Sequence, residues 1–313
     1  MSRLAAVTGA TGFLGRRLVA TLAAEGWTVR VLCRRDPVDA AWRGLEPQVV
    51  LGDLADLAAL KRLCAGADAV IHVAGVIKAR TRADYEAANV EGARRLALAA
   101  GVAAPGAPVI LISSLAAREP QLSDYAGTKR AGETVAAEVL GPRLTVARPP
   151  VVYGPGDWET LSLFKAATKS PVLPLLDPAA RIAMIHVEDA SRQVAWLAGN
   201  PSGGVVSLSD ERPEGYSWRE LMGEAARACG RTPALVRIPA AAARLAGLVG
   251  EARRLMGSTP MLSAGKTREL LHTDWSVPQG EGALAAPPPS IGLSEGFRQT
   301  VRWYRAAGWL EAE

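Results

Sequence analysis

Short apolar runs alternate with amphipathic stretches along the first half of the chain. The runs predict strands at Leu4–Thr8, Thr28–Cys33, Val49–Leu51, Ala69–Val73, Pro108–Ser113 and Leu144–Ala147. Apolar positions at helical spacing predict helices over Phe13–Ala24, Leu57–Cys64, Ala83–Ala100 and Tyr125–Leu140. This alternation indicates the α/β class, with a doubly wound parallel sheet and right-handed crossovers. Ligands of such sheets bind beyond the carboxyl ends of the strands.

The pattern changes after Pro155, where prolines mark loops and a strand is expected at Arg181–His186. Periodicity predicts further helices at about Glu188–Ala198, Tyr216–Cys229, Ala240–Met256, Leu262–His272 and Leu293–Ala307, and a loop at Gly280–Ser290. We therefore expect two domains. Residues 1–155 form the doubly wound domain, and residues 156–313 form a smaller, mostly helical substrate-binding cap. Some segments within about 181–210 are expected to belong to the core of the first domain.

Composition narrows the class of protein. With 49% hydrophobic and 21% charged residues, the chain has the composition of a typical folded globular protein. Its net charge of +5 is distributed along the whole chain. Basic runs interleaved with aromatic residues are absent, so no nucleic-acid partner is expected. Three scattered cysteines and three histidines predict a reducing location and no metal site. Because no apolar run could span a membrane and a strand begins by Leu4, a cytoplasmic protein is expected.

A glycine-rich turn joins the first strand to the first helix. Gly9, Gly12 and Gly15 form a G-x-x-G-x-x-G pattern there. Glycine lets backbone N–H groups approach an anion closely, and the following helix N-terminus adds about half a positive charge. The turn therefore predicts a pyrophosphate cradle, whose other members are Thr11, Phe13 and Leu14.

Tyr125 and Lys129 lie four residues apart in a predicted helix and therefore share one face. A phenol is a poor acid–base group at neutral pH, but a close ammonium favours its phenolate form. This pair predicts a proton donor or acceptor beside a fixed cation.

Further segments occur in a fixed order with these two motifs. They are Gly52-Asp53-Leu54, His72-Val73-Ala74-Gly75, Asn89-Val90-Glu91-Gly92, Ser113-Ser114, Arg148-Pro149-Pro150-Val151-Val152-Tyr153-Gly154-Pro155 and His186-Val187-Glu188-Asp189. Together the segments resemble the extended short-chain dehydrogenase/reductase family, which is epimerase/dehydratase-like. The resemblance implies a Rossmann-type domain that binds a nicotinamide dinucleotide, with a cap that binds a small-molecule substrate.

The resemblance also implies roles for single residues. Ser114, Tyr125 and Lys129 would be catalytic, with Ser114 holding the substrate oxygen and Lys129 also holding the nicotinamide ribose. Ser113 would be structural and bond the turn backbone. The remaining cofactor contacts implied are Asp53 (at the adenine), Leu54, Ala74, Gly75, Pro149 and Val151. For Asn89 an ordinary polar role and a functional one both stay open, and none of the histidines is expected to be catalytic.

The end of the second strand bears on the choice of cofactor. An acidic residue there binds the ribose 2′-hydroxyl of NAD, whereas arginine accommodates the 2′-phosphate of NADP. Here the strand runs into Cys33-Arg34-Arg35, and two guanidiniums can fork onto a phosphate. The sequence therefore predicts NADP(H), held by Arg34 and Arg35.

Two departures from the family pattern bear on the reaction. Sugar-nucleotide epimerases and dehydratases of the family usually show Arg-Phe-x-Asn near the sixth strand and Arg-Asp-Phe before the His-Val-x-Asp turn. This chain has Arg148-Pro149-Pro150 and Ile182-Ala183-Met184 at these places, and it resembles the ketone and alcohol oxidoreductases instead. An NADPH-dependent ketone reductase is the leading hypothesis. A nucleotide-sugar epimerase or dehydratase and a non-catalytic NADP-binding subunit are the alternatives.

The predicted cap contains an apolar helical stripe, at Leu245, Leu248, Val249, Ala252, Leu255 and Met256. Such a stripe most often contacts a core, but beside arginines it also suits a lipid-like substrate or a membrane surface. Trp158, Trp196, Trp218, Trp275, Trp303 and Trp309 also lie in this half. The Arg148–Pro150 segment and the Pro260–Trp275 stretch are similar to bacterial ceramide reductases, which reduce a 3-oxo lipid with NADPH. A monomer or a homodimer is expected.

Overall fold

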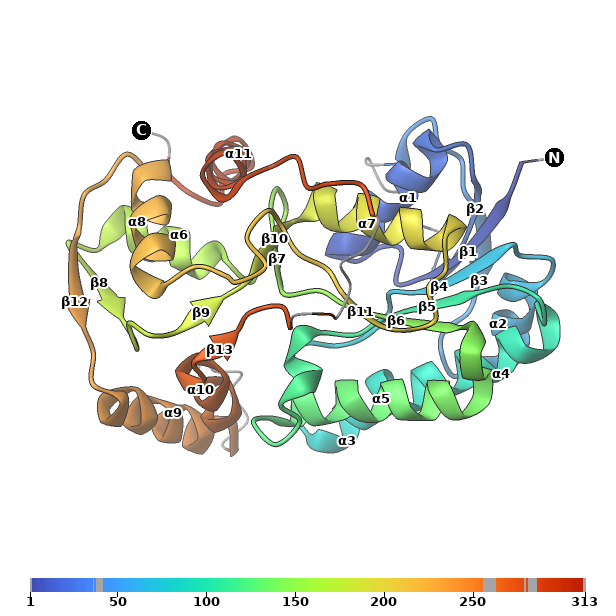
Figure 1. The fold of residues 1–313 in the computed structure, drawn as a ribbon, viewed down its shortest axis with the longest axis horizontal. Coiled ribbons are helices and arrows are strands. Elements are labelled where there is room, and N and C mark those ends of the chain that lie inside the picture. The colour runs from blue at the N-terminus through green and yellow to red at the C-terminus, as the bar shows by residue number, and fades with distance from the viewer. Residues whose placement is uncertain are drawn as a thin grey trace. The chain divides into compact units, whose positions relative to one another are not determined.

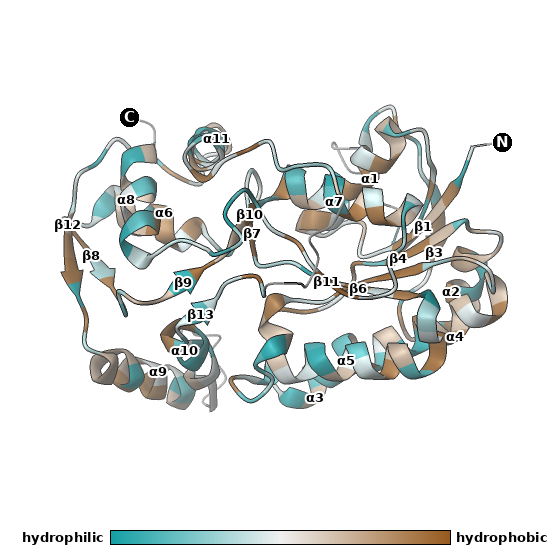
Figure 2. Ribbon diagram, in the orientation of Figure 1, coloured by the Kyte–Doolittle hydropathy of each residue, from teal (hydrophilic) through white to brown (hydrophobic). Residues whose placement is uncertain are grey.

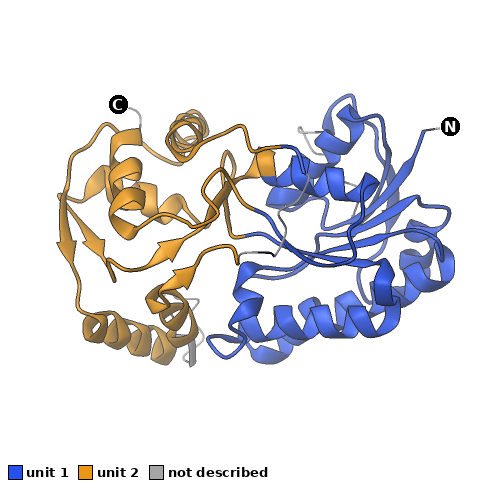
Figure 3. Cartoon of the chain, viewed as in Figure 1, with its two compact units in different colours: residues 1–149, 190–208, 279–287 blue, residues 150–189, 209–278, 288–313 orange. Residues whose placement is uncertain are grey.

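The computed structural model describes residues 2–35, 37, 42–255, 263–278, 280 and 286–311, the side chains of residues 254 and 255 excepted. The chain divides into two compact units (Figure 3). The first consists of residues 1–149, 190–208 and 279–287, as far as these are described. The second contains 150–189, 209–278 and 288–313, with the same restriction.

A seven-stranded sheet forms the first unit, with strand order β11-β6-β5-β4-β1-β2-β3 and every pair parallel. Its strands are β1 (Leu4–Thr8), β2 (Thr28–Cys33), β3 (Gln48–Leu51), β4 (Ala69–His72), β5 (Val109–Ile112), β6 (Leu144–Arg148) and β11 (Gly204–Ser207). The predicted α/β class is confirmed. The strand order reverses between β4 and β1, which is where doubly wound sheets bind their ligands.

Helices cover both faces of this sheet (Figure 1). On one face lie α1 (Phe13–Ala24) and the C-terminal part of α7 (Val187–Gly199), joined by a hydrogen bond of 2.9 Å between the Thr21 and Ser191 hydroxyls. On the other face lie α2 (Leu57–Cys64), α4 (Gly92–Ala103) and α5 (Asp124–Leu140). Their apolar sides and the buried strands form one continuous hydrophobic core.

The helix predicted over Ala83–Ala100 has three parts. These are α3 (Arg82–Tyr85), a π-helical segment over Glu86–Glu91, and α4. The apolar periodicity did not reveal the middle part, because a segment of six residues is too short to distinguish a π-helical from an α-helical period. Short π-helical segments occur frequently at functional sites, and this one contains the buried Asn89.

The second unit packs helices around three two-stranded parallel sheets, β7/β10, β8/β12 and β9/β13. Its strands are β7 (Val151–Tyr153), β8 (Val172–Leu175), β9 (Arg181–Ile182), β10 (Met184–His186), β12 (Ala234–Arg237) and β13 (Asp274–Trp275). Its helices are α6 (Leu161–Lys169), α8 (Trp218–Ala228), α9 (Ala240–Leu255), α10 (Ala264–Leu271) and α11 (Leu293–Ala306). The expected single strand Arg181–His186 is wrong, because Ala183 separates β9 from β10 and each pairs with a different partner.

Aromatic side chains fill the core of the second unit. The ring of Phe297 lies edge-on to those of Tyr153 and Phe164, at 5.0 Å between centroids in both pairs. Trp309 packs against Trp158 at 4.1 Å and against Trp303 at 4.8 Å. Trp309 therefore contacts two tryptophans at the surface of this unit rather than in its core, because Trp158 is 64% and Trp303 36% exposed.

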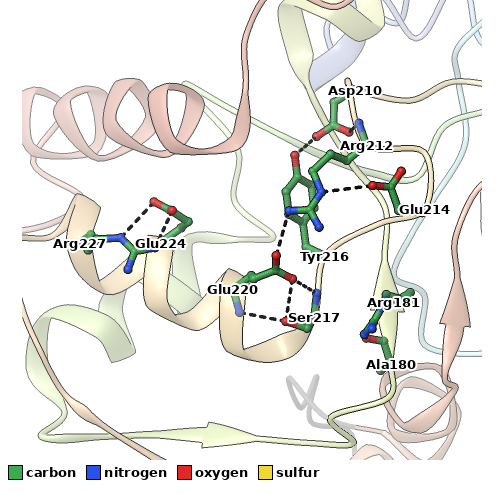
Figure 4. A network of polar contacts seen from close by, with 10 residues as sticks. All are labelled: Ala180, Arg181, Asp210, Arg212, Glu214, Tyr216, Ser217, Glu220, Glu224 and Arg227. Atoms are coloured by element: carbon green, nitrogen blue, oxygen red, sulfur yellow. Dashed lines mark hydrogen bonds and ion pairs between the residues drawn. The ribbon is translucent and has the colours of Figure 1, made fainter.

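A polar network holds the segment that leads into α8 (Figure 4). The Tyr216 hydroxyl donates to Asp210 at 2.7 Å, and Arg212 donates to Glu220 at 2.9 Å. Ser217 and Glu220 form a reciprocal capping box at the start of α8. Burial raises the pKa of the Asp210 carboxyl to about 6. The network fixes this loop by local hydrogen bonds.

No helix among the described residues is long and apolar enough to cross a membrane. Within the same ranges, no group of three His, Cys, Asp or Glu residues could hold a metal ion.

Candidate active site

The glycine turn brings the backbone of β1 against that of β4. Gly9 has a φ of +69°, and a Cβ there would lie 2.5 Å from the backbone nitrogen of Ala74. A Cβ on Gly15 would overlap the carbonyl of Gly9. Since neither position has room for a side chain, the first turn of α1 lies directly on the end of the strand.

The N-terminus of α1 suits an anionic ligand. Its N-cap is Gly12, no side chain caps it, and its first turn contains no acidic residue. The backbone N–H groups of that turn therefore have no side-chain acceptor and can bind an anion. These features fit the pyrophosphate of a dinucleotide, held by Gly9–Gly15 with Thr11, Phe13 and Leu14 in the same turn.

Arg34 and Arg35 follow β2 directly, and both are exposed. Among the described residues, neither guanidinium has an ion-pair partner. Two exposed cations at the carboxyl end of a strand beside β1 fit a phosphate on the adenosine ribose. Asp36, the next acidic residue, lies outside the described residues.

A buried hydrogen bond joins the ends of β1 and β4. The Thr8 hydroxyl lies 2.7 Å from Nδ1 of His72, and both residues are almost fully buried. Burial, with a smaller contribution from the charge of Lys129, lowers the pKa of His72 to about 3. His72 is therefore neutral, and its expected non-catalytic role agrees with this position.

Lys129 extends from α5 to the ends of β4 and β5. Its ammonium donates to the carbonyl of Ile112 at 2.7 Å, and a Cβ on Gly75 would lie 3.6 Å from its Nζ. Burial lowers the pKa of Lys129 to about 8, and the carboxylate of Glu133 opposes this shift. Tyr125 is one turn earlier on α5, half-buried, with its ring 6.5 Å from that of Tyr85. The helix thus presents a phenol and an ammonium at the carboxyl edge of the sheet.

Sequence reasoning missed Glu133, a buried carboxylate one turn after Lys129 on α5. Arg148 donates to both oxygens of its carboxylate, at 2.9 and 2.6 Å, and the two residues are only 4% and 6% exposed. The Ser113 hydroxyl donates to the same carboxylate at 2.5 Å. The expectation that Ser113 bonds the turn backbone is wrong, because its side chain points to α5. The four-residue spacing from Lys129 was a signal that could have identified Glu133.

Ser114 and Asn89 hold two turns at the same edge of the sheet. The Ser114 hydroxyl accepts a hydrogen bond from the Ala116 N–H at 3.2 Å, and the residue is half-buried. The Asn89 amide bonds the N–H and the carbonyl of Val76, at 2.9 and 3.1 Å, and the Thr128 hydroxyl at 3.2 Å. Asn89 therefore fixes the Gly75–Val76 turn beside Lys129.

Other predicted cofactor residues lie at or near the strand ends. Asp53 is exposed and accepts hydrogen bonds from the N–H groups of Ala55 and Asp56, at 2.8 and 3.2 Å. Leu54 packs against Gly92 of α4, where a Cβ would meet it at 2.8 Å. Pro149 is the last residue of the first segment of the first unit, whereas Val151 is the first residue of β7 in the second unit. The contact of these two residues with a cofactor stays a prediction.

The first unit therefore combines a parallel sheet, a glycine cradle at its topological switch point and a Tyr–Lys pair on one helix. This defines the class of protein as a dinucleotide-binding α/β oxidoreductase. Residues 5–208 match the NAD dependent epimerase/dehydratase family. The chain belongs to this family, so the predicted resemblance is confirmed, and its cofactor class is a nicotinamide dinucleotide.

Individual relatives agree with this assignment. The chain is 52% identical over 309 residues to a ceramide reductase of Caulobacter vibrioides, covering 97% of this chain and 95% of that protein. It is 30% identical to the 4-hydroxy-2-methyl-3-oxo-4-farnesyl-3,4-dihydroquinoline-1-oxide ketoreductase of Stigmatella aurantiaca, covering 78% and 79% of the two chains. The solved structure of gox2253 shares the fold, with a TM-score of 0.78, 21% identity and coverage of 99% and 100%.

Proposed function

We propose that this chain reduces a ketone to an alcohol on a hydrophobic, lipid-like substrate, with NADPH as the reductant and a 3-oxo-ceramide as the candidate substrate. The observation that carries the substrate class is the 52% identity to a ceramide reductase across 97% of the chain. The 30% identical relative is also a ketoreductase, and its named substrate carries a farnesyl chain.

The choice of NADPH rests on the end of β2. Arg34 and Arg35 are exposed there with no carboxylate partner in the described ranges. A guanidinium pair favours a 2′-phosphate by charge-assisted hydrogen bonds, whereas it offers little to a ribose hydroxyl.

The proposed chemistry uses three side chains. A bound nicotinamide supplies the hydride that reaches the carbonyl carbon. The Ser114 hydroxyl donates a hydrogen bond to the carbonyl oxygen, and the Tyr125 hydroxyl gives that oxygen its proton. Lys129, whose ammonium lies near Gly75, would hold the ribose hydroxyls of the bound nucleotide, and its positive charge favours the phenolate that remains on Tyr125. Solvent then returns a proton to Tyr125.

A coenzyme and substrate comparison tests this proposal. Purified protein is given NADPH or NADH with a 3-oxo-ceramide in detergent micelles, and nucleotide oxidation is followed by absorbance. We expect oxidation of NADPH, with NADH much less effective. In parallel, UDP- and GDP-sugars are offered without added nucleotide. Their interconversion by tightly bound NAD would assign the chain to the epimerases and dehydratases instead.

A further inference from the structure

Helix α9 of the second unit has two contrasting faces. Its inner face packs on α10, because Gly247 is buried and a Cβ there would come within 2.8 Å of the Thr267 Cβ. The outer face presents three large apolar side chains at spacings of three and four residues, namely Leu245, Leu248 and Val249. They are 64%, 62% and 49% exposed. We call these three residues the α9 face.

The α9 face is unusual for a helix on a protein surface. Leu245, Leu248 and Val249 of the predicted stripe are exposed rather than buried in a core, so the more common interpretation is wrong for them. Met256 and the side chain of Leu255, which also belong to the predicted stripe, lie outside the described residues. The preceding segment continues the apolar character, with Val236 48% and Ile238 36% exposed (Figure 2). Clusters of exposed apolar side chains of this kind mark interaction sites.

The charges beside the α9 face are basic. Arg237, Arg244 and Arg253 are exposed, and no described carboxylate pairs with them. The acidic residue of α9, Glu251, is partly buried and accepts a hydrogen bond from the Ala264 N–H at 3.3 Å, at the start of α10. An apolar helical face whose neighbouring arginines have no carboxylate partner in the described part of the chain is complementary to anionic headgroups above an apolar layer.

We propose that the α9 face binds the surface of a lipid bilayer that contains anionic headgroups, with Leu245, Leu248 and Val249 in the interface. A second copy of this chain is the less suitable occupant, because it would bring the same unpaired arginines together. The inference goes beyond the proposed reaction, since binding to a bilayer depends on neither nucleotide nor turnover.

Vesicle cosedimentation tests the inference. Wild-type protein is mixed with vesicles of phosphatidylcholine alone, or of phosphatidylcholine and phosphatidylglycerol in equal parts. We expect binding to the anionic vesicles, and a roughly 10- to 100-fold loss in Leu245→Gln/Leu248→Gln. Arg244→Gln/Arg253→Gln is expected to lose roughly 10- to 30-fold at low salt, with a smaller loss at high salt.

The matched control is Val102→Gln, which changes an exposed valine on α4 (70% exposed) and is expected to bind vesicles as the wild type does. Because all the substituted side chains are exposed, circular dichroism should show an unchanged fold. Three results would overturn the inference. These are no binding of the wild type to either vesicle, equal binding by Leu245→Gln/Leu248→Gln, or a solution dimer that this variant dissociates.

Discussion

Glu133→Gln is the sharpest perturbation of the candidate site, because it removes one charge and keeps the shape of the side chain. The carboxylate accepts two hydrogen bonds from the buried Arg148 and one from Ser113. Breaking a buried ion pair by removing one partner typically costs about 3–5 kcal/mol. We expect a loss of this size in the free energy of unfolding, measured by urea titration with and without nucleotide.

The same substitution should change the pH dependence of turnover. Glu133 raises the pKa of Lys129 against the effect of burial, and that pKa is about 8. Residues four apart on a helix lie about 6 Å apart, and a unit charge at that distance with an effective dielectric constant near 20 is worth about 3 kcal/mol, or about two pKa units. We therefore expect the alkaline limb of kcat to move towards lower pH by up to about two units, because Lys129 loses its proton earlier.

Two controls separate a local effect from a general one. Glu138→Gln changes an exposed glutamate on the same helix, and its stability should stay within about 0.5 kcal/mol of wild type. Glu133→Gln/Arg148→Met removes both charges, and it should lose less stability than the two single changes added together. Unchanged stability and an unmoved alkaline limb in Glu133→Gln would refute the reasoning.

Four further variants probe the cofactor cradle and the serines. Arg34→Ala/Arg35→Ala should weaken NADPH binding roughly 10- to 100-fold and leave NADH binding almost unchanged, since one or two charge-assisted hydrogen bonds are lost; calorimetric titration measures both. Ser113→Ala should destabilise the fold by about 1.5–3 kcal/mol, because its hydroxyl bonds a buried carboxylate. Ser114→Ala should instead lower kcat by roughly 10²-fold with little change in stability. Gly9→Ala should abolish tight nucleotide binding and destabilise the unit by about 1–3 kcal/mol, because the methyl group meets Ala74 at a positive φ; thermal unfolding with and without nucleotide checks it.

The arginine variant and the Gly9 variant each have a matched control. Lys61→Ala/Arg62→Ala removes two exposed cations from α2 and should leave nucleotide affinity unaltered. Gly26→Ala also stands at a positive φ, +81°, but nothing lies within 4 Å of its Cβ, so only backbone strain of about 1 kcal/mol is expected. Equal loss of NADPH and NADH binding in the arginine variant would contradict the NADPH assignment. Full turnover by Ser114→Ala would contradict the proposed role of the Ser114 hydroxyl in catalysis.

The first unit could be predicted well from the sequence, because its strands are buried runs between amphipathic helices. Strands β1 and β2 begin and end at the predicted residues. Strand β11 was missed, since Gly204–Ser207 is a short stretch whose pairing with β6 connects segments far apart in the chain. Such long-range pairing leaves no local pattern.

The positions of the candidate site residues could be predicted where they depend on local spacing, but not where they depend on packing. The glycine turn and the Tyr125–Lys129 pair are local motifs, and the structure places both at the carboxyl edge of the sheet. The sequence around Arg148 does not indicate which residue pairs with it, because its partner Glu133 lies on another element. Periodicity likewise predicted the apolar stripe of α9 without revealing whether protein or solvent covers it.

The most direct test of the central claim follows the hydride and the proton donor together. Wild type and Tyr125→Phe are each given NADPH in which both hydrogens at C4 of the nicotinamide are deuterium, together with a 3-oxo-ceramide, and the alcohol formed is analysed by mass spectrometry. We predict one deuterium in each product molecule from the wild type, and turnover lower by about 10²–10⁴-fold in Tyr125→Phe with NADPH affinity retained. Tyr85→Phe, which changes the neighbouring ring, should react as the wild type does. An unlabelled product, or full turnover by Tyr125→Phe, would contradict the account.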